Sequence, residues 1–499
     1  MPVRCLVKPG AYFDSVVLMR IAAKLSARPG VRAASLVMAT PSNKDVLAAV
    51  GLLTDETAGA GPNDLVVAVD ADEGSIEELF AAADEALSRG ATPSAYEGGE
   101  PRRARALAAV DATLAIISTP GRYAAAEALK ALRLGMSAFV FSDNVPIEQE
   151  VALKREAHER GLLVMGPDCG TAIVAGVPLG FANQVRRGDI GLIGASGTGL
   201  QQVSSLIDRW GAGISHMIGV GSRDLSAAVG ATSMLDALDA LAADPATRVL
   251  GLVSKPPDPA IAEAVLIRAA ASGKPVIAAF LGAEGEAPKG VVLAATLEQA
   301  ARLLVREATG EEPPSLGESD VQLSPLGDER RLLRGLYAGG TFAYEAALIL
   351  EPGLGAISAD ARSPSVNRPA ELPDQHMILD LGDDRFTVGR PHPMIDPGMR
   401  LDMLRAAAQD PRTAVIILDV VLGHLAGDDP GGDLAPAIAA ITATENAPCV
   451  VAFVVGTAAD PQGLGRQERT LGEAGAHLAT SSSAAARLAG SLLAAEVAR

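Results

Sequence analysis

The sequence predicts an α/β protein made of several domains with parallel sheets. Short apolar runs that are typical of strands alternate with Ala- and Leu-rich runs that are typical of helices along most of the chain. The chain has 499 residues, which is too long for one hydrophobic core. A strand, a glycine loop and a helix also follow one another twice in the same pattern, so we expect two related α/β units.

The repeated pattern begins with an apolar strand that runs into a glycine loop. Residues 190–199 (IGLIGASGTG) precede a predicted helix over residues 200–210, and residues 333–344 (LRGLYAGGTFAY) precede a predicted helix over residues 345–350. Two further strands follow in the same order: residues 249–254 and 276–282 in the first copy, and residues 414–420 and 449–456 in the second. An insertion at residues 352–375 accounts for most of the roughly 30 extra residues in the second copy.

Two more domains are predicted before the first copy. Strands at residues 4–7, 33–37 and 64–69 alternate with helices at 14–27 and 75–87, and after the polar segment 88–105 come strands at 113–118, 138–141 and 162–165 with helices at 123–134 and 147–160. We therefore expect an N-terminal α/β domain (1–105), a second domain (106–187), the first copy (188–307), a Pro- and Glu-rich linker (308–330) and the second copy (331–499).

Composition excludes several function classes. A net charge of −18 would repel a phosphate backbone, and aromatic residues make up only 3%, so we expect no nucleic-acid partner. Cys5, Cys169 and Cys449 are far apart and form no CxxC pair, which argues against a disulfide framework or a zinc site. We find neither an N-terminal hydrophobic signal core nor an apolar run long enough to cross a bilayer, and we expect a cytoplasmic protein with no membrane partner.

The two glycine loops are candidate anion sites. Small residues let backbone N–H groups approach an anion, and the dipole of the following helix favours negative charge. The predicted phosphate-binding residues are Ser196, Gly197, Thr198, Gly339, Gly340 and Thr341. A tight strand-to-helix turn is the alternative reading. No Lys follows the glycines as in a Walker A loop, and Ser196 lacks the GxSxG pattern of a hydrolase nucleophile.

A polar loop at residues 381–396 (LGDDRFTVGRPHPMID) carries the candidate catalytic residues. Arg390 beside His392 suits a planar carboxylate or amide ligand, while Asp383 and Asp384 could hold Mg²⁺ or pair with arginines. A solvated loop with internal ion pairs is the alternative. Of the six histidines, His392 and His424 follow strands and are the candidates for acid–base chemistry.

The loop at residues 165–171 (MGPDCGT) is a candidate ligand loop because it directly follows a predicted strand. A structural Pro/Gly turn is the alternative. No basic residue is adjacent to Cys169, so we do not expect that thiol to be catalytic.

Several segments resemble a known family. Residues 116–123 (IISTPGRY), 141–146 (FSDNVP), 161–171 (GLLVMGPDCGT) and 188–199 (GDIGLIGASGTG) are similar in order and spacing to the CoA-binding and ligase domains of the succinyl-CoA synthetase alpha subunit. Residues 335–346 and 377–384 resemble the carboxyl-terminal ligase domain of the beta subunit. With residues 12–19 and 387–396, the whole chain resembles the FdrA family.

The resemblance implies Rossmann-like and flavodoxin-like domains of the succinyl-CoA synthetase type. It makes CoA a candidate ligand, with Mg²⁺ as a second candidate. The CoA-contacting residues that it implies are Thr119, Pro120, Asp143, Asn144 and Asp168. It also implies small anions as ligands, namely phosphate, carbamoyl phosphate and an oxamate-like acid. Companion protein subunits in an oligomer are implied as well.

The chain departs from the synthetase pattern in two places. Residues 282–296 contain no histidine where the synthetase carries its phosphohistidine, and the linker at 308–330 has no room for an ATP-grasp domain. The FdrA resemblance implies a subunit of an oxamate carbamoyltransferase of allantoin catabolism, which converts oxalurate and phosphate to oxamate and carbamoyl phosphate. An acyl-CoA ligase completed by a separate ATP-binding subunit and a non-catalytic scaffold are the alternatives.

Overall fold

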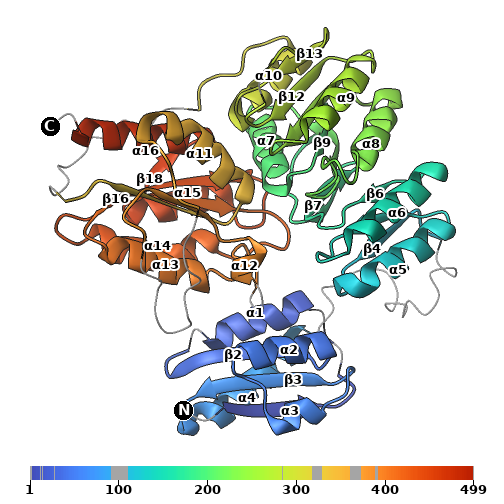
Figure 1. The fold of residues 1–499 in the computed structure, drawn as a ribbon. Coiled ribbons are helices and arrows are strands. Elements are labelled where there is room, and N and C mark those ends of the chain that lie inside the picture. Colours follow the sequence, from blue (N-terminus) through green and yellow to red (C-terminus); the bar gives the residue numbers. More distant parts are fainter. Residues whose placement is uncertain are drawn as a thin grey trace. The chain divides into compact units, whose positions relative to one another are not determined.

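The computed structural model describes residues 3–11, 13, 15–26, 28–90, 111–283, 285–316, 329–359, 372–387 and 391–497 (Figure 1). They belong to two compact units. Unit 1 comprises residues 1–103 with 381–402, and unit 2 comprises residues 104–380 with 403–499. The five-part division expected from the sequence stays a prediction.

Unit 1 is built on a three-stranded sheet in the order β1-β3-β2, with β1 (Val3–Lys8) and β2 (Val31–Met38) both antiparallel to β3 (Leu65–Ala71). Helices α1 (Ser15–Ser26) and α4 (Ile76–Gly90) contribute to one hydrophobic cluster, while a second cluster includes residues of α2 (Pro41–Ala49). The remaining short elements are α3 (Asp55–Gly59), the 3-10 turn η1 (Glu73–Ser75) and α12 (Asp384–Thr387), and α13 (Gly398–Gln409) begins in this unit.

The antiparallel sheet differs from the parallel sheet expected for this segment. The run LVVAV at residues 65–69 is fully buried. Burial of both faces removes the alternation of polar and apolar residues that is typical of antiparallel strands, so the sequence indicated burial but not strand direction.

Unit 2 begins with a small parallel sheet. Strands β4 (Leu114–Ile117), β5 (Ser137–Val140) and β6 (Val164–Met165) lie in that order. Helices α5 (Gly121–Arg133) and α6 (Ile147–Glu159) share a hydrophobic cluster with the sheet. The loops at the carboxyl ends of these strands carry the five residues that the resemblance assigned to CoA.

The other two sheets of unit 2 contain the two copies. The first has the strand order β13-β12-β11-β9-β10-β7-β8 and the second has the order β15-β14-β16-β17-β18. The strands of the first sheet are β7 (Thr171–Val174), β8 (Val177–Gly180), β9 (Arg187–Gly194), β10 (Ile214–Gly219), β11 (Val249–Ser254), β12 (Val276–Phe280) and β13 (Val291–Leu293). Its helices are α7 (Gly197–Arg209), α8 (Thr232–Ala243), α9 (Pro259–Ala270) and α10 (Leu297–Thr309).

The second copy repeats this topology. Its strands are β14 (Leu332–Tyr337), β15 (Met377–Asp380), β16 (Thr413–Val421), β17 (Cys449–Val455) and β18 (His477–Ala479), and its helices are α11 (Gly340–Leu354), α14 (Pro430–Thr442), α15 (Leu464–Glu473) and α16 (Ser482–Val497). Read from the far edge, β18-β17-β16-β14-β15 has the same order as β13-β12-β11-β9-β10, and all pairs within both sets are parallel. The predicted duplication is therefore confirmed.

Both helices that follow the glycine loops begin earlier than the sequence predicted. Helix α7 begins at Gly197 and α11 at Gly340, so each glycine loop already forms the first helical turn. The side chain of Ser196 caps α7 by accepting the N–H of Gly199 at 3.0 Å. The glycines consequently lie at helix N-termini and not in an extended loop before them.

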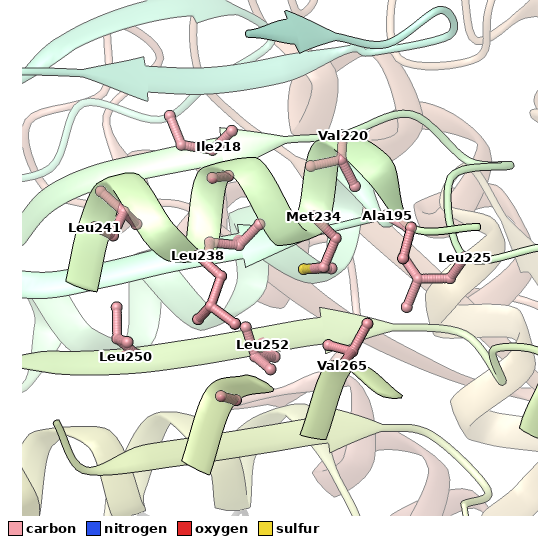
Figure 2. Packing of buried hydrophobic residues seen from close by; sticks show 14 of the residues in the cluster. Ala195, Ile218, Val220, Leu225, Met234, Leu238, Leu241, Leu250, Leu252 and Val265 are labelled. Carbon is pink, nitrogen blue, oxygen red and sulfur yellow. The ribbon is translucent and has the colours of Figure 1, made fainter. Parts of the chain in front are cut away.

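The core of the first copy is a continuous apolar cluster. Figure 2 shows Met234, Leu238 and Leu241 of α8 in the same cluster as Leu250 and Leu252 of β11. No helix in the described part of the chain is both long and apolar enough to cross a membrane.

We expect Leu238→Ala to destabilise unit 2 by about 2–5 kcal/mol, because the side chain is fully buried and its removal leaves a cavity. The measurement is the shift of the urea unfolding transition followed by circular dichroism. Ile267→Ala on the neighbouring helix α9 is the control, because Ile267 is 55% exposed, and it should change stability by less than about 0.5 kcal/mol. Equal shifts for the two variants would contradict this account of the core.

Candidate anion-binding site

The first turns of α7 and α11 meet in unit 2. The hydroxyl oxygens of Ser196 and Thr341 lie 2.5 Å apart and are hydrogen-bonded, and both residues are buried. The methyl group of Thr198 is 2.9 Å from the point that a Cβ atom on Gly339 would occupy. Two helix N-termini, one from each copy, therefore meet here, and all six predicted phosphate-binding residues lie at the two helix starts.

Four backbone donors are open at this junction. Among the described residues, the N–H groups of Gly197, Thr198, Gly340 and Thr341 have no hydrogen-bond partner. The first N–H groups of a helix lack intrahelical acceptors and carry the positive end of its dipole. Gly197 is exposed and Gly340 is half-buried, so an anion from solvent can reach donors on both helices.

Asp419 corrects the expectation for Gly339. This fully buried carboxylate on β16 accepts the N–H of Ala338 at 2.8 Å and the N–H of Gly339 at 3.0 Å. The backbone N–H of Gly339 is therefore already hydrogen-bonded within the protein. In the first copy the equivalent Ala195 N–H donates to the backbone oxygen of Val253 at 3.1 Å, so the carboxylate belongs to the second copy alone within this pair of loops.

One polar cluster joins the segment between β8 and β9 to the second copy. Asn183 donates to Asp460 at 2.8 Å and to the backbone oxygen of Leu422 at 2.9 Å, and the N–H of Gln184 donates to Asp460 at 2.7 Å. Thr457 completes the cluster by donating its hydroxyl to the oxygen of Gln184 at 2.6 Å. Burial raises the pKa of Asp460. The hydrogen bonds that its carboxylate accepts from the Gln184 N–H, the Asn183 side chain and the Thr457 N–H oppose that rise.

A second polar cluster joins the copies one helical turn further along α11. Glu345 is fully buried, accepts the N–H of Leu297 at 2.7 Å and accepts the hydroxyl of Ser482. These partners are the first residues of α10 and α16, and α16 packs against α11 (Figure 1). Burial raises the pKa of Glu345 to about 7, and the hydrogen bonds from Ser482 and Leu297 only partly offset it.

Two charged side chains that the sequence analysis missed flank Gly340. The Lys255 ammonium is 3.1 Å from the point that a Cβ atom on Gly340 would occupy, and a carboxylate oxygen of Asp380 is closer still. Lys255 directly follows β11 and Asp380 ends β15. Their positions at the carboxyl ends of parallel strands were the signal that could have identified them.

The predicted catalytic residues and the two helix N-termini belong to different units of the chain. His392 is part of unit 1, whereas both helix N-termini are part of unit 2, and Arg390 lies outside the described residues. Burial, and then the positive charge of Arg400, lower the pKa of His392 to about 4, while its Nδ1 accepts the N–H of Met394 at 3.2 Å. The imidazole is therefore neutral near pH 7, and a role for it beside phosphate stays a prediction.

The other polar candidates have local structural contacts. Asp383 accepts the N–H of Arg385 at 3.0 Å at the start of α12. The backbone N–H of His424 donates to the oxygen of Ala182 at 3.1 Å, which places His424 in the contact between the two copies. Among the residues that the structure describes, no three His, Cys, Asp or Glu side chains form a group that could hold a metal ion.

The predicted CoA residues lie in three loops at the carboxyl ends of β4, β5 and β6. Thr119 and Pro120 precede α5, Asp143 and Asn144 follow β5, and all four are exposed. The backbone oxygens of Asp143 and Asn144 lie directly against the Cα of Gly121, the first residue of α5. A side chain in place of Gly121 would collide with these backbone oxygens, so only a glycine fits at this helix start.

The third of these loops has a structural role. Asp168 accepts the hydroxyl of Ser222 at 2.5 Å, and its N–H donates to the oxygen of Ser142 at 2.9 Å. Burial raises the pKa of Cys169 to about 12, and its thiol donates to the oxygen of Gly219 at 3.3 Å. A protonated, buried thiol agrees with the expectation that Cys169 is not a nucleophile.

Known proteins resemble the chain in all its parts. Family models match residues 1–104 (AllF, heavy metal-associated domain), 187–303 (succinyl-CoA ligase like flavodoxin domain) and 336–492 (CoA-ligase). The uncharacterized protein YahF of Escherichia coli strain K12 is 40% identical over 506 residues, which cover 97% of each chain. The chain belongs to the same family as YahF.

More distant similarities were also found. A mitochondrial succinate–CoA ligase [ADP-forming] subunit alpha-2 of Trichomonas vaginalis is 28% identical over 181 residues, 35% of this chain and 57% of that protein. The apo structure of a dinucleotide-forming acetyl-coenzyme A synthetase 1 of Ca. Korarchaeum cryptofilum matches with 18% identity and a TM-score of 0.34, over 79% of this chain and 85% of that one. The chain is thus a succinyl-CoA ligase-like α/β protein, as predicted.

The match to a heavy metal-associated domain is not accompanied by a metal-binding cysteine pair. Cys5 is the sole cysteine of residues 1–104. It is half-buried, its thiol donates to the oxygen of Leu52 at 3.8 Å, and burial raises its pKa. A protonated single thiol is a poor ligand for a soft metal ion.

We expect Glu345→Gln to change how stability depends on pH. The folded-state pKa of about 7 lies above the unfolded value, so the folded chain holds more protons between about pH 4.5 and 7 and stability falls as pH rises through that window. The Gln amide can keep both hydrogen bonds without ionising. The variant should match the native chain at pH 5 and exceed its stability at pH 8 by up to about 3 kcal/mol.

The measurement is the urea midpoint of both chains from pH 5 to pH 8. Glu263→Gln is the control, because Glu263 is an exposed residue of helix α9 and the substitution changes the net charge by the same amount. If the native chain and the Glu345→Gln variant show the same pH dependence, Glu345 does not titrate in this range.

Proposed function

We propose that the chain is a subunit of a carbamoyl-transferring enzyme of the FdrA type, which converts oxalurate and phosphate to oxamate and carbamoyl phosphate in allantoin catabolism. The observation that carries the proposal is the set of four open N–H groups on Gly197, Thr198, Gly340 and Thr341 at two facing helix N-termini. The match of residues 1–104 to an AllF domain supports the link to this pathway.

The reaction needs no covalent enzyme intermediate. An oxygen of hydrogen phosphate attacks the terminal carbamoyl carbon of oxalurate and forms the new C–O bond. The C–N bond to the oxamate moiety then breaks, and the proton that phosphate carried passes to the oxamate nitrogen. Both sides of this reaction carry the same atoms and the same charge of three negative units.

The two helix starts would contribute orientation and electrostatic stabilisation. Phosphate held by donors from both α7 and α11 has a fixed position relative to the carbamoyl carbon, which removes much of the entropy cost of bringing two reactants together. The hydroxyl pair of Ser196 and Thr341 fixes the distance between the helices. Arg390 and His392 are assigned to the organic acid, with the neutral imidazole acting as a hydrogen-bond donor from Nε2.

An acyl-CoA ligase completed by an ATP-binding subunit is the second candidate, because residues 336–492 match the CoA-ligase model. Such an enzyme would require a phosphorylated residue and CoA. Residues 282–296 contain no histidine where the synthetase carries its phosphohistidine, so we derive no step through a phosphoenzyme or CoA. Transfer of labelled phosphate from ATP to the chain with a nucleotide-binding subunit would favour this candidate over the carbamoyltransferase.

A non-catalytic scaffold is the third candidate. A chain with a purely structural role would gain no stability from phosphate, carbamoyl phosphate or CoA, since a ligand raises the melting temperature only by binding the folded state. The leading proposal of a carbamoyl-transferring enzyme includes phosphate, carbamoyl phosphate and an oxamate-like acid as ligands, and companion protein subunits as partners.

We expect Gly340→Ala to abolish phosphate-dependent consumption of oxalurate by the chain with its companion subunits. The new methyl group would collide with Asp380 and narrow the approach to the helix start. The control is Gly353→Ala in the same helix, where a methyl group meets nothing within 4 Å, and it should keep full activity. Product formation is measured as carbamoyl phosphate and oxamate in equal amounts.

Phosphate should also raise the melting temperature of the native chain and of the Gly353→Ala variant but not that of Gly340→Ala. The proposal fails if the native chain with its companions consumes no oxalurate when phosphate is supplied. If Gly340→Ala keeps full activity, the start of α11 is not the phosphate site.

A further inference from the structure

Lys255 and Asp380 bring opposite charges to one end of the anion site. Lys255 comes from the first copy and Asp380 from the second, and both approach the Cα of Gly340. The Cα–Cβ bonds of a helix tilt toward its N-terminus. Atoms close to the position that a Cβ atom on Gly340 would occupy therefore lie beside the N-terminus of α11. A ligand on the Gly340 N–H would therefore lie beside an ammonium group and a carboxylate.

A buried hydroxyl at the other helix start independently indicates a ligand position. Thr171 is 1% exposed, and its Oγ1 atom has no hydrogen-bond partner among the described residues. Its methyl group is 3.5 Å from the Cβ point of Gly197, the first residue of α7. Buried hydroxyls are nearly always hydrogen-bonded, so the Thr171 hydroxyl has spare capacity for a water molecule or ligand, in a residue that packs against the start of α7.

We propose that Lys255 and Asp380 make this site selective for carbamoyl phosphate over other acyl phosphates. Lys255 binds the anionic oxygens, and Asp380 accepts a hydrogen bond from the carbamoyl NH₂ group. This inference rests on the proposed function, because it assigns the ligand class of the same site. A carboxylate has about four lone-pair positions, so Asp380 can accept this bond in addition to its existing contacts.

The charge arrangement explains why an acyl phosphate without N–H donors would bind less well. Its methyl or methylene group would meet the Asp380 carboxylate and offer it no hydrogen bond, while its phosphate would still feel the repulsion of that charge. A carbamoyl group supplies two N–H donors and changes the carboxylate from a repulsive neighbour into a partner. Sites built to hydrogen-bond an NH group discriminate strongly against analogues that lack it.

The test compares carbamoyl phosphate, acetyl phosphate and inorganic phosphate as ligands of the full chain by calorimetric titration. The native chain should bind carbamoyl phosphate at least about tenfold more tightly than acetyl phosphate. Asp380→Ala removes the acceptor and should bring that ratio close to one while inorganic phosphate binds as tightly or more tightly. Lys255→Met should weaken all three ligands by about tenfold or more, and Lys255→Arg should restore part of the loss.

Lys289→Met is the matched control, because Lys289 is exposed and its loss changes the net charge by the same amount. It should leave all three affinities unchanged. The far-ultraviolet circular dichroism and melting temperature of each variant verify that it is folded.

The outcomes separate this inference from the proposed function. If the native chain binds none of the three ligands, the proposed function is overturned. If it binds carbamoyl phosphate and Asp380→Ala keeps the preference over acetyl phosphate, only the selectivity role of Asp380 is overturned. If Lys255→Met binds like Lys289→Met, Lys255 does not contact the ligand.

Discussion

The structure of unit 2 depends on two helices that meet with their positive ends together. Each helix N-terminus carries about half a unit of positive charge, and two such ends repel one another at close range. The hydrogen bond between Ser196 and Thr341 holds them in contact at the centre. The clusters around Asp460 and Glu345 join the same two copies on the flanks, so the arrangement is fixed without a bound anion. An anion between the helices would remove the remaining repulsion.

Buried carboxylates determine which backbone donors stay open. Asp419 takes the N–H groups of Ala338 and Gly339, whereas the donors one and two residues later have no acceptor among the described residues. Asp419 therefore positions the loop before α11 and restricts ligand contacts to the helical residues themselves. A chain with a net charge of −18 can in this way retain a local anion site, because short-range donors outweigh screened long-range repulsion.

The sequence predicted the duplication because its signals are local. Apolar strands and glycines are adjacent in the chain, so the strand-to-helix turns at residues 196–198 and 339–341 could be located from the pattern, although both helices begin a few residues earlier than expected. Lys255 and Asp419 could not be assigned, because they are 85 and 79 residues away from Gly340 in the sequence. Lys255 follows β11 and approaches Gly340, and Asp419 lies on β16 and accepts the N–H groups of the loop before α11. Such contacts depend on the order of the strands in the sheet. The sequence indicated that order only through the repeated strand–loop–helix pattern. The antiparallel sheet of unit 1 escaped prediction because β3 is buried on both faces.

The two copies also differ in a way that bears on chemistry. The loop before α7 is closed by a neutral backbone contact between Ala195 and Val253, and the loop before α11 by the carboxylate of Asp419. The dipole of α11 is therefore partly neutralised at its start, while that of α7 is not. An anion between the two helices would therefore interact more strongly with the dipole of α7 than with that of α11. Lys255 and Asp380 lie at the start of α11, so the two copies have also diverged in the charged residues that surround their helix starts.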